Sequence, residues 1–135
     1  MPELAVSADK VAFLIEKARE FDVKEGVTDP DSGSNPTDDN VIDVLEDTHD
    51  DPVAQEITGF VNGLTEDEQI DLVSLMRLGR GDGTIEEWDE LWRETREETR
   101  DRPAVHTLLG EPLVSDYLAE GLSAFGVSWA DAAPE

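Results

Sequence analysis

The sequence predicts an all-α protein, folded as one compact bundle of five to seven helices with one long irregular loop. Apolar residues recur at spacings of three and four along most of the chain, which is the period of a helix with one buried face. Helix start signals, two of them capping boxes, precede several of these stretches. No stretch between turn signals alternates apolar and polar residues as a half-buried strand would. The 135 residues fit a single domain, residues 1–135.

The first predicted helix follows Ser7, which is a suitable N-cap, and is expected to end near Gly26. Its apolar stripe consists of Val11, Leu14, Ile15, Ala18 and Phe21. Residues 27–36 then change to prolines, a glycine and small polar residues, which predicts the long irregular loop. Thr37 is a candidate cap for a short helix through Val41, Ile42 and Leu45.

The middle of the chain has two clear helix starts. Asp51 followed by Pro52 places a cap before proline at the first helical position. Thr65 and Glu68 have the spacing of a capping box. The helix behind this box is apolar on more than one face, so we expect it at the centre of the core. The glycine-rich residues 79–83 are expected to end it.

A second capping box, Thr84 with Glu87, begins a helix that carries two tryptophans on its apolar side. Its other side is rich in charge, and Asp89 with Arg93 is one of two i,i+4 pairs in the favourable order. The second such pair is Glu98 with Arg102.

The last third of the chain is punctuated by prolines and glycines. Pro103 marks either a break or a new helix start, and a short helix is expected behind it that reaches Gly110. Pro112 begins the last predicted helix, whose stripe starts at Leu113, and Gly126 ends it. Residues 127–135 have no helical pattern and are predicted to form a loose tail.

The formal charge of −24 limits the partners that this chain can have. Binding of nucleic-acid phosphates needs clustered lysine and arginine, and an anionic membrane surface repels a chain of this charge. The remaining partners are basic protein surfaces, cations and neutral molecules. Abundant acid with scarce lysine is also what solubility in a high-salt interior selects. No signal peptide or apolar run of membrane-spanning length is visible, so we expect a cytoplasmic protein.

The acidic residues of the long loop are candidate ligands for Ca²⁺ or Mg²⁺, because hard cations prefer oxygen ligands. The candidates are Asp29, Asp31, Asp38 and Asp39. They do not have the spacing of an EF-hand, and the alternative is a solvated loop held by Asx turns and prolines.

Asp82 is a further candidate cation ligand, because residues 82–85 read like the second half of an EF-hand loop. The first half is absent, since two ligand positions fall on Leu78 and Arg80. The alternative interpretation is a tight connection between helices in which Asp82 serves the turn.

Trp88 and Trp92 are one helical turn apart and therefore share a face. One interpretation places both in the core, because tryptophan contributes much of the buried area of a small domain. The other makes them an exposed anchor for a partner helix or for a second copy of the chain.

The sequence contains no arrangement that indicates catalysis. It has no cysteine and two histidines, and none of its serines lies in a nucleophile elbow. His49 lies among acids and His106 lies in a short predicted helix, with no nucleophile indicated beside either. We therefore expect no catalytic residues and no bound cofactor apart from a possible divalent cation.

Several strings of this chain resemble an uncharacterised bacterial family described only as a domain of unknown function. The strings are residues 18–22, 33–39, 66–73, 79–82, 87–88 and 117–122. The resemblance extends roughly from Val11 to Gly126. It implies a small acidic bacterial cytoplasmic protein, and it assigns no catalytic or binding residue.

Three hypotheses for function remain after these exclusions. The first is a non-catalytic interaction or regulatory protein that acts through protein–protein contacts, with another protein or as a homodimer. The second is a divalent-cation-binding protein that uses the acidic loops. The third is an acidic mimic of nucleic acid that binds a basic protein, which requires carboxylates in rows on one face.

Overall fold

The computed structural model describes residues 3–28 and 52–129. Within these two ranges the chain forms six α-helices, one turn of 3-10 helix and no strand, so the all-α prediction is confirmed. The predicted short helix after Thr37 and residues 29–36 of the predicted loop lie outside the described residues. The elements are α1 (Ala8–Thr28), α3 (Pro52–Asn62), α4 (Glu66–Arg80), η2 (Ile85–Glu87), α5 (Trp88–Asp101), α6 (Ala104–Leu109) and α7 (Val114–Ala124).

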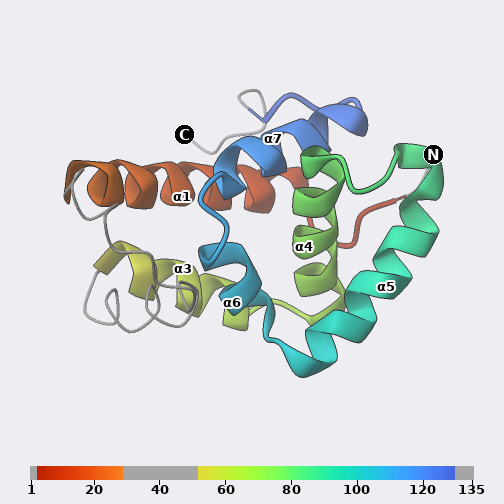
Figure 1. Cartoon of the computed structure of the whole chain (residues 1–135), viewed down its shortest axis with the longest axis horizontal. Coiled ribbons are helices and arrows are strands. Elements are labelled where there is room, and N and C mark those ends of the chain that lie inside the picture. The colour runs from red at the N-terminus through yellow and green to blue at the C-terminus, as the bar shows by residue number, and fades with distance from the viewer. Residues whose placement is uncertain (1–2, 29–51, 130–135) are drawn as a thin grey trace.

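Helix α4 is the centre of the bundle, as its apolar sequence predicts. It packs against α5, α6 and α7, while α1 packs against α7 and α3 (Figure 1). Helix α5 runs along the outer edge, and its main neighbour among the described elements is α4.

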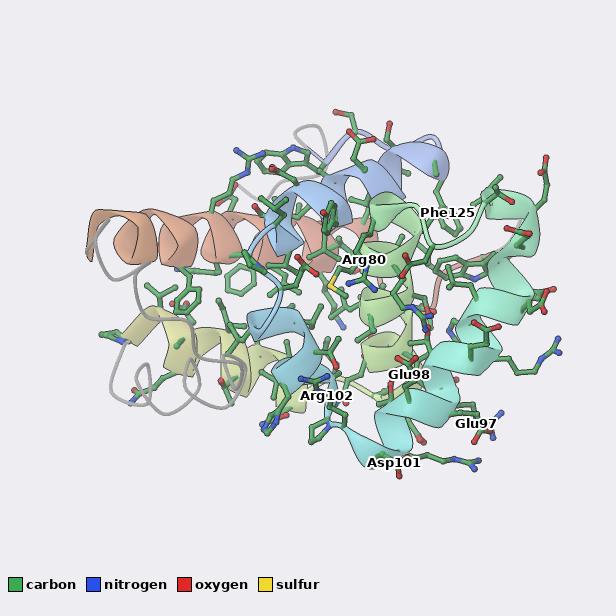
Figure 2. All side chains as sticks on the ribbon, viewed as in Figure 1. Arg80, Glu97, Glu98, Asp101, Arg102 and Phe125 are labelled. Carbon is green, nitrogen blue, oxygen red and sulfur yellow. The ribbon has the colours of Figure 1, made fainter. Side chains whose placement is uncertain are left out.

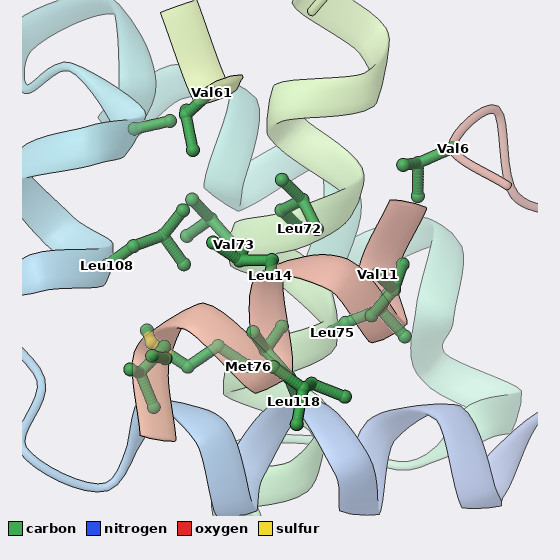
Figure 3. Packing of buried hydrophobic residues seen from close by; sticks show 14 of the residues in the cluster. Val6, Val11, Leu14, Val61, Leu72, Val73, Leu75, Met76, Leu108 and Leu118 are labelled. Atoms are coloured by element: carbon green, nitrogen blue, oxygen red, sulfur yellow. The ribbon is translucent and has the colours of Figure 1, made fainter. Parts of the chain in front are cut away.

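One cluster of buried apolar side chains joins all six helices and the segment before α1. Leu72, Leu75 and Met76 of α4 meet Leu14 of α1 and Leu118 of α7 within it (Figure 3). Each of these five side chains is at most 1% exposed. The stripes predicted from helical spacing therefore form one continuous core.

Both predicted capping boxes start helices in the structure. At α4, the Thr65 hydroxyl accepts from the Glu68 backbone N–H at 3.1 Å, and Glu68 Oε1 accepts from the Thr65 N–H at 2.9 Å. Lys10 donates to the other oxygen of Glu68 at 3.0 Å, which ties the start of α1 to the start of α4. At η2, Glu87 Oε1 accepts from the Thr84 N–H at 3.0 Å.

Helix α1 ends later than the sequence predicts, whereas α4 ends within the predicted residues 79–83. Helix α1 continues through Gly26 to Thr28, because a glycine can adopt helical angles at a modest cost. Helix α4 continues through Gly79 to Arg80 and ends at Gly81, whose φ of 99° is left-handed. The Asp82 N–H then donates back to the Arg77 carbonyl at 3.0 Å. This is a Schellman ending, in which Gly81 supplies the conformation that other residues rarely adopt.

Gly79 and Gly121 allow α4 and α7 to cross with their backbones in contact. A Cβ built on Gly79 would lie 1.9 Å from the Tyr117 carbonyl oxygen, and one built on Gly121 would lie 2.4 Å from the Leu75 carbonyl oxygen. Each glycine thus faces the backbone of the other helix. In the sequence Gly79 looks like part of a helix break, whereas its role in the fold is this close approach.

The last helix begins two residues later than predicted, at Val114. Leu113 lies in the turn before it and is 49% exposed, so it does not belong to the buried stripe. At the other end, the Val127 N–H donates to the Leu122 carbonyl at 3.0 Å. Trp129 packs over Arg19, with the guanidinium carbon 5.0 Å from the ring centroid. Val127 and Trp129 of the predicted tail are therefore packed against the core, Ser128 between them is exposed, and residues 130–135 lie outside the described part of the chain.

Ser74 is a buried polar residue of α4 for which we predict a stabilising substitution. Its side chain is fully buried, and among the described residues its hydroxyl has no hydrogen-bond partner. Burial of an unpaired hydroxyl costs about 1–3 kcal/mol. We therefore expect Ser74→Ala to raise the free energy of unfolding, measured with urea, by about 1 kcal/mol.

Thr95→Val is the matched control for this substitution. Thr95 is equally buried, but its hydroxyl accepts from Arg77 Nη1 at 3.0 Å and donates to the Leu91 carbonyl at 2.8 Å. Thr95→Val removes this paired hydroxyl and should therefore lower the free energy of unfolding by about 1 kcal/mol. A Ser74→Ala protein less stable than the wild type would contradict the assignment of an unpaired hydroxyl.

Candidate functional site

The two tryptophans differ in burial. Trp88 is buried, as the core interpretation predicts, whereas Trp92 is only half-buried. Trp88 is 3% exposed and meets Phe125 edge-on, with ring centroids 4.9 Å apart. It is therefore a core residue at the start of α5. Trp92 is half-buried, and its indole N–H donates to Asp71 Oδ1 at 2.8 Å. Together with Leu91 and Thr95, the pair fixes the inner face of α5 against α4.

Asp71 is a buried carboxylate that the sequence analysis did not single out. It is 3% exposed, and its Oδ2 accepts from the backbone N–H groups of Ala5 and Val6, the latter at 3.0 Å. With the Trp92 indole, three N–H donors converge on one side chain. Asp71 thus joins the N-terminal segment, α4 and α5.

The pKa of Asp71 is raised above the ordinary value for an aspartate, chiefly because burial disfavours the charged form. The N–H donors of Val6, Trp92 and Ala5 oppose this shift, and the nearby charge of Asp67 adds to it. The net direction indicates that the ionised carboxylate is held at some cost in solvation.

Asp82 lies at the end of α4, where two arginines hold it. Its Oδ2 accepts from Arg80 at 2.7 Å and from Arg77 Nε at 3.4 Å. The hydrogen bond from Arg80 is the main reason that the pKa of the Asp82 carboxyl lies below its ordinary value. Arg80 also donates to Glu111 at 2.9 Å, which links this corner to the turn before α7. Asp82 therefore contributes to the connection between helices, and its role as a cation ligand stays a prediction.

The remaining cation candidates, Asp29, Asp31, Asp38 and Asp39, lie outside the described residues, and their role stays a prediction. Within residues 3–28 and 52–129, no group of three or more acids or histidines is arranged to hold a metal ion. His106 is half-buried in α6, and His49 lies outside the described ranges.

A row of exposed carboxylates follows one side of η2 and α5. Residues spaced by three and four lie on the same side of a helix, and the five acids of this spacing form what we name the acidic flank. The acidic flank consists of Glu87, Glu90, Glu94, Glu98 and Asp101, all exposed. A shallow groove of about 180 Å³ runs along its first half, lined by Glu87, Glu90, Glu94, Leu91, Asp82 and Gly83.

Arg77 borders the acidic flank from the side of α4. Its guanidinium lies 3.8 Å from a Glu94 oxygen and 3.6 Å from a Glu98 oxygen. Figure 2 shows Glu98 on the side of α5 that faces α4, and Glu97 and Asp101 at the outer end. The i,i+4 pairs expected from the sequence, Asp89 with Arg93 and Glu98 with Arg102, do not form ion pairs in the described structure. Glu98 turns to Arg77 instead.

The arginines of α5 lie on a different side of the helix. Arg93, Arg96 and Arg100 are also spaced by three and four, but they lie one or two positions before the acids of the flank. Asp89 and Glu97 lie beside these arginines, and Glu97 accepts from Arg100 at 3.3 Å. The outer surface of α5 is therefore divided lengthwise into the acidic flank and a side with charges of both signs. The sequence contains this division, and the structure adds which sides are exposed.

Comparison with known proteins identifies the family. The family model described as "Protein of unknown function (DUF3775)" matches residues 54–127, which is more than half of the chain. The chain belongs to the DUF3775 family. The matched region contains four of the six strings that carried the resemblance, while residues 18–22 and 33–39 lie outside it. No curated protein and no solved structure matches this DUF3775 chain.

The DUF3775 match covers the elements that build the acidic flank and the crossing of α4 with α7. It assigns no reaction, ligand or partner. Among the described helices, none has the length and apolar character to cross a membrane.

Proposed function

We propose that this DUF3775 chain is a non-catalytic interaction or regulatory protein that binds a basic surface of a partner protein through the acidic flank. The observation that supports this proposal most directly is the row of five exposed carboxylates along η2 and α5, because the inner face of α5 is fixed in the core. A preorganised row of charge aids specificity and the rate of encounter more than it aids affinity.

Two features of α5 support a contact with a separate molecule. First, the outer side of α5 has no other helix of the described structure as a main neighbour. Second, the flank carries five carboxylates and is bordered by one arginine, so it retains a negative charge after Arg77 is counted. A surface of this kind attracts lysine and arginine side chains over several ångströms.

A basic partner suits this surface better than a second copy of the chain does. Each copy carries a formal charge of −24, so association of two copies works against mutual repulsion. A partner protein rich in lysine and arginine gains from the same charge. We extend the proposal to a bacterial cytoplasmic setting, as the sequence led us to expect.

The acidic flank also supplies the row of carboxylates that the nucleic-acid-mimic hypothesis requires. In that case the partner would be a protein whose basic groove ordinarily binds nucleic acid phosphates. The two hypotheses share the same surface on this chain and differ in the identity of the partner.

The proposal predicts that removing two charges from the acidic flank weakens the binding of a basic peptide more than removing two charges elsewhere does. The probe is a capped octalysine peptide, and its dissociation constant is measured by isothermal titration calorimetry. Glu90 and Asp101 have no ion-pair partner among the described residues, so Glu90→Gln with Asp101→Asn removes charge without breaking a bridge. We expect this double variant to bind the peptide about fivefold more weakly than the wild type.

The matched control is the double variant Glu16→Gln with Glu120→Gln. Both residues are exposed, lie on α1 and α7, and change the net charge by the same amount. The control should bind the peptide within about twofold of the wild type. Equal weakening in the two double variants would mean that only the total charge acts, and would contradict a role for the flank.

A further inference from the structure

A second surface feature lies beside α5, on the side of Trp92 and away from the acidic flank. It is a shallow pocket of about 260 Å³ where the N-terminal segment, the start of α4 and the start of α5 meet. Its lining consists of Glu3, Ala5, Asp67, Asp71, Trp88, Asp89 and Trp92. Three different parts of the chain therefore contribute carboxylates to one pocket that has tryptophan in its wall.

The aromatic wall of this pocket is held in place before any ligand arrives. The Trp92 indole N–H donates to Asp71 Oδ1 at 2.8 Å, and Asp71 is in turn held by the backbone of Ala5 and Val6. The ring therefore has a fixed orientation, which reduces the entropy lost on binding.

The charges around the pocket are uncompensated. Glu3, Asp67 and Asp89 are exposed, and none of them forms an ion pair with a lysine or arginine of the described structure. No basic side chain lines the pocket. The carboxylates come from the N-terminal segment, α4 and α5, and the described residues hold no group of three acids or histidines arranged for a metal ion.

Carboxylates spread around an indole suit an organic cation. An ammonium group over an aromatic ring is attracted by the ring electrons, and surrounding carboxylates add a longer-range attraction. A methylene chain can pack on the ring while the charged end faces the acids. A bare metal ion would need its oxygen ligands within direct coordination distance.

We infer that the pocket between Trp92, Asp67 and Asp89 binds an alkylammonium group, supplied by a lysine side chain of the basic partner. The assignment to a partner lysine depends on the proposed function, whereas the recognition of an alkylammonium group does not. The pocket would give the partner a specific point of attachment beside the diffuse attraction of the acidic flank.

The test uses n-butylammonium, which has the chemistry of a lysine side chain, and follows the indole signals in proton–nitrogen correlation NMR spectra. Trp88, Trp92 and Trp129 give three indole signals, and Trp92→Phe identifies the one from Trp92. We expect that signal to move saturably, with a midpoint in the millimolar range. Neutral n-butanol and sodium chloride at equal ionic strength should not reproduce the movement.

Asp67→Asn with Asp89→Asn should weaken the binding of n-butylammonium about fivefold. Glu16→Gln with Glu120→Gln removes the same charge elsewhere and should leave it unchanged. The proposed binding of an alkylammonium group is overturned by any of three results. The Trp92 signal does not saturate, sodium chloride moves it equally, or the two double variants bind n-butylammonium with the same affinity.

A second pair of probes tests the source of the ammonium group. A capped tripeptide with a central lysine should move the Trp92 signal, and the same peptide with norleucine should not. Binding of n-butylammonium without binding of the lysine peptide would overturn the assignment to a protein side chain. Octalysine binding that still depends on Glu90 and Asp101 would in that case leave the proposed function intact.

Discussion

Substitution of Gly79 by alanine is expected to destabilise this protein by about 3 kcal/mol or more. A Cβ at this position would lie 1.9 Å from the carbonyl oxygen and 2.7 Å from the carbonyl carbon of Tyr117. Both atoms belong to the backbone of α7, so no side chain can rotate away and the two central helices must separate. The melting temperature, followed by circular dichroism, should fall by about 10 °C or more.

The reciprocal substitution, Gly121→Ala, should act in the same direction, because its Cβ would lie 2.4 Å from the Leu75 carbonyl oxygen. Gly59→Ala is the control. Gly59 is also inside a helix, α3, but a Cβ built there meets nothing within 4 Å. Alanine is the better helix former, so this variant should be more stable by about 0.5–1 kcal/mol. A Gly79→Ala protein that melts at or above the wild type would contradict the close crossing of α4 and α7.

Removal of the Asp71 side chain is expected to have the second-largest effect. Asp71→Ala leaves three N–H groups without their acceptor, and that of Val6 is buried. We expect a loss of about 3 kcal/mol in the free energy of unfolding, measured with urea. Asp71→Asn should be intermediate, because one amide oxygen cannot serve all three donors. Trp92→Phe removes one donor and leaves the carboxylate paired, so it should cost about 1 kcal/mol.

The pH dependence of the same variants has a definite sign. Burial raises the pKa of Asp71 in the folded protein, so the folded state takes up this proton more readily than the unfolded state does. The contribution of Asp71 to stability therefore increases as the pH falls from 7 towards about 4. Asp71→Asn lacks this contribution, and its deficit relative to the wild type should grow over that range. A deficit that shrinks on acidification would contradict the direction of the shift.

Asp82 provides a contrast in the pH dependence. Its pKa is lowered by the hydrogen bond from Arg80, so its contribution is present at neutral pH and is lost only below the ordinary aspartate range. The two aspartates therefore act in different pH windows. Comparing the wild type with Asp71→Asn at each pH cancels the contribution of Asp82 and isolates that of Asp71.

Local signals in the sequence predicted most of the described helices. The capping box of Thr65 with Glu68 starts α4, and Pro52 is the first residue of α3. These features depend on residues a few positions apart, which is why the sequence alone could identify them. The predicted stripes became the buried core for the same reason, since helical spacing determines which side chains share a face.

Contacts between distant residues account for what the sequence did not predict. Gly79 looks like a helix breaker in isolation, and its role depends on Tyr117 of another helix. Asp71 is one acid among the 34 acidic residues of the chain, and its partners Ala5, Val6 and Trp92 are far away in sequence. A signal for Asp71 existed in its position between Ile70 and Leu72, inside an apolar stretch, where a charge needs a partner.

The tryptophan pair also depends on contacts between residues that are distant in sequence. Helical spacing placed Trp88 and Trp92 on one face but could not say that Phe125 covers the first, while Asp71 binds the second. For Asp82, the structure adds the two arginines that hold its carboxylate, which lie two and five residues earlier in the chain. The spacing of the acids is enough to place those of the acidic flank on one side of the helix. Their exposure depends on which side of α5 faces α4.

The most direct test of the proposed function is to map octalysine binding residue by residue. Backbone signals in a proton–nitrogen correlation NMR spectrum are followed during the titration. We expect the largest changes at Glu87, Glu90, Glu94, Glu98 and Asp101, and changes near zero at Glu16 and Glu120. Changes of equal size at exposed acids of α1, α3, α4 and α7 would show that the peptide responds only to the total charge, and would contradict recognition by the acidic flank.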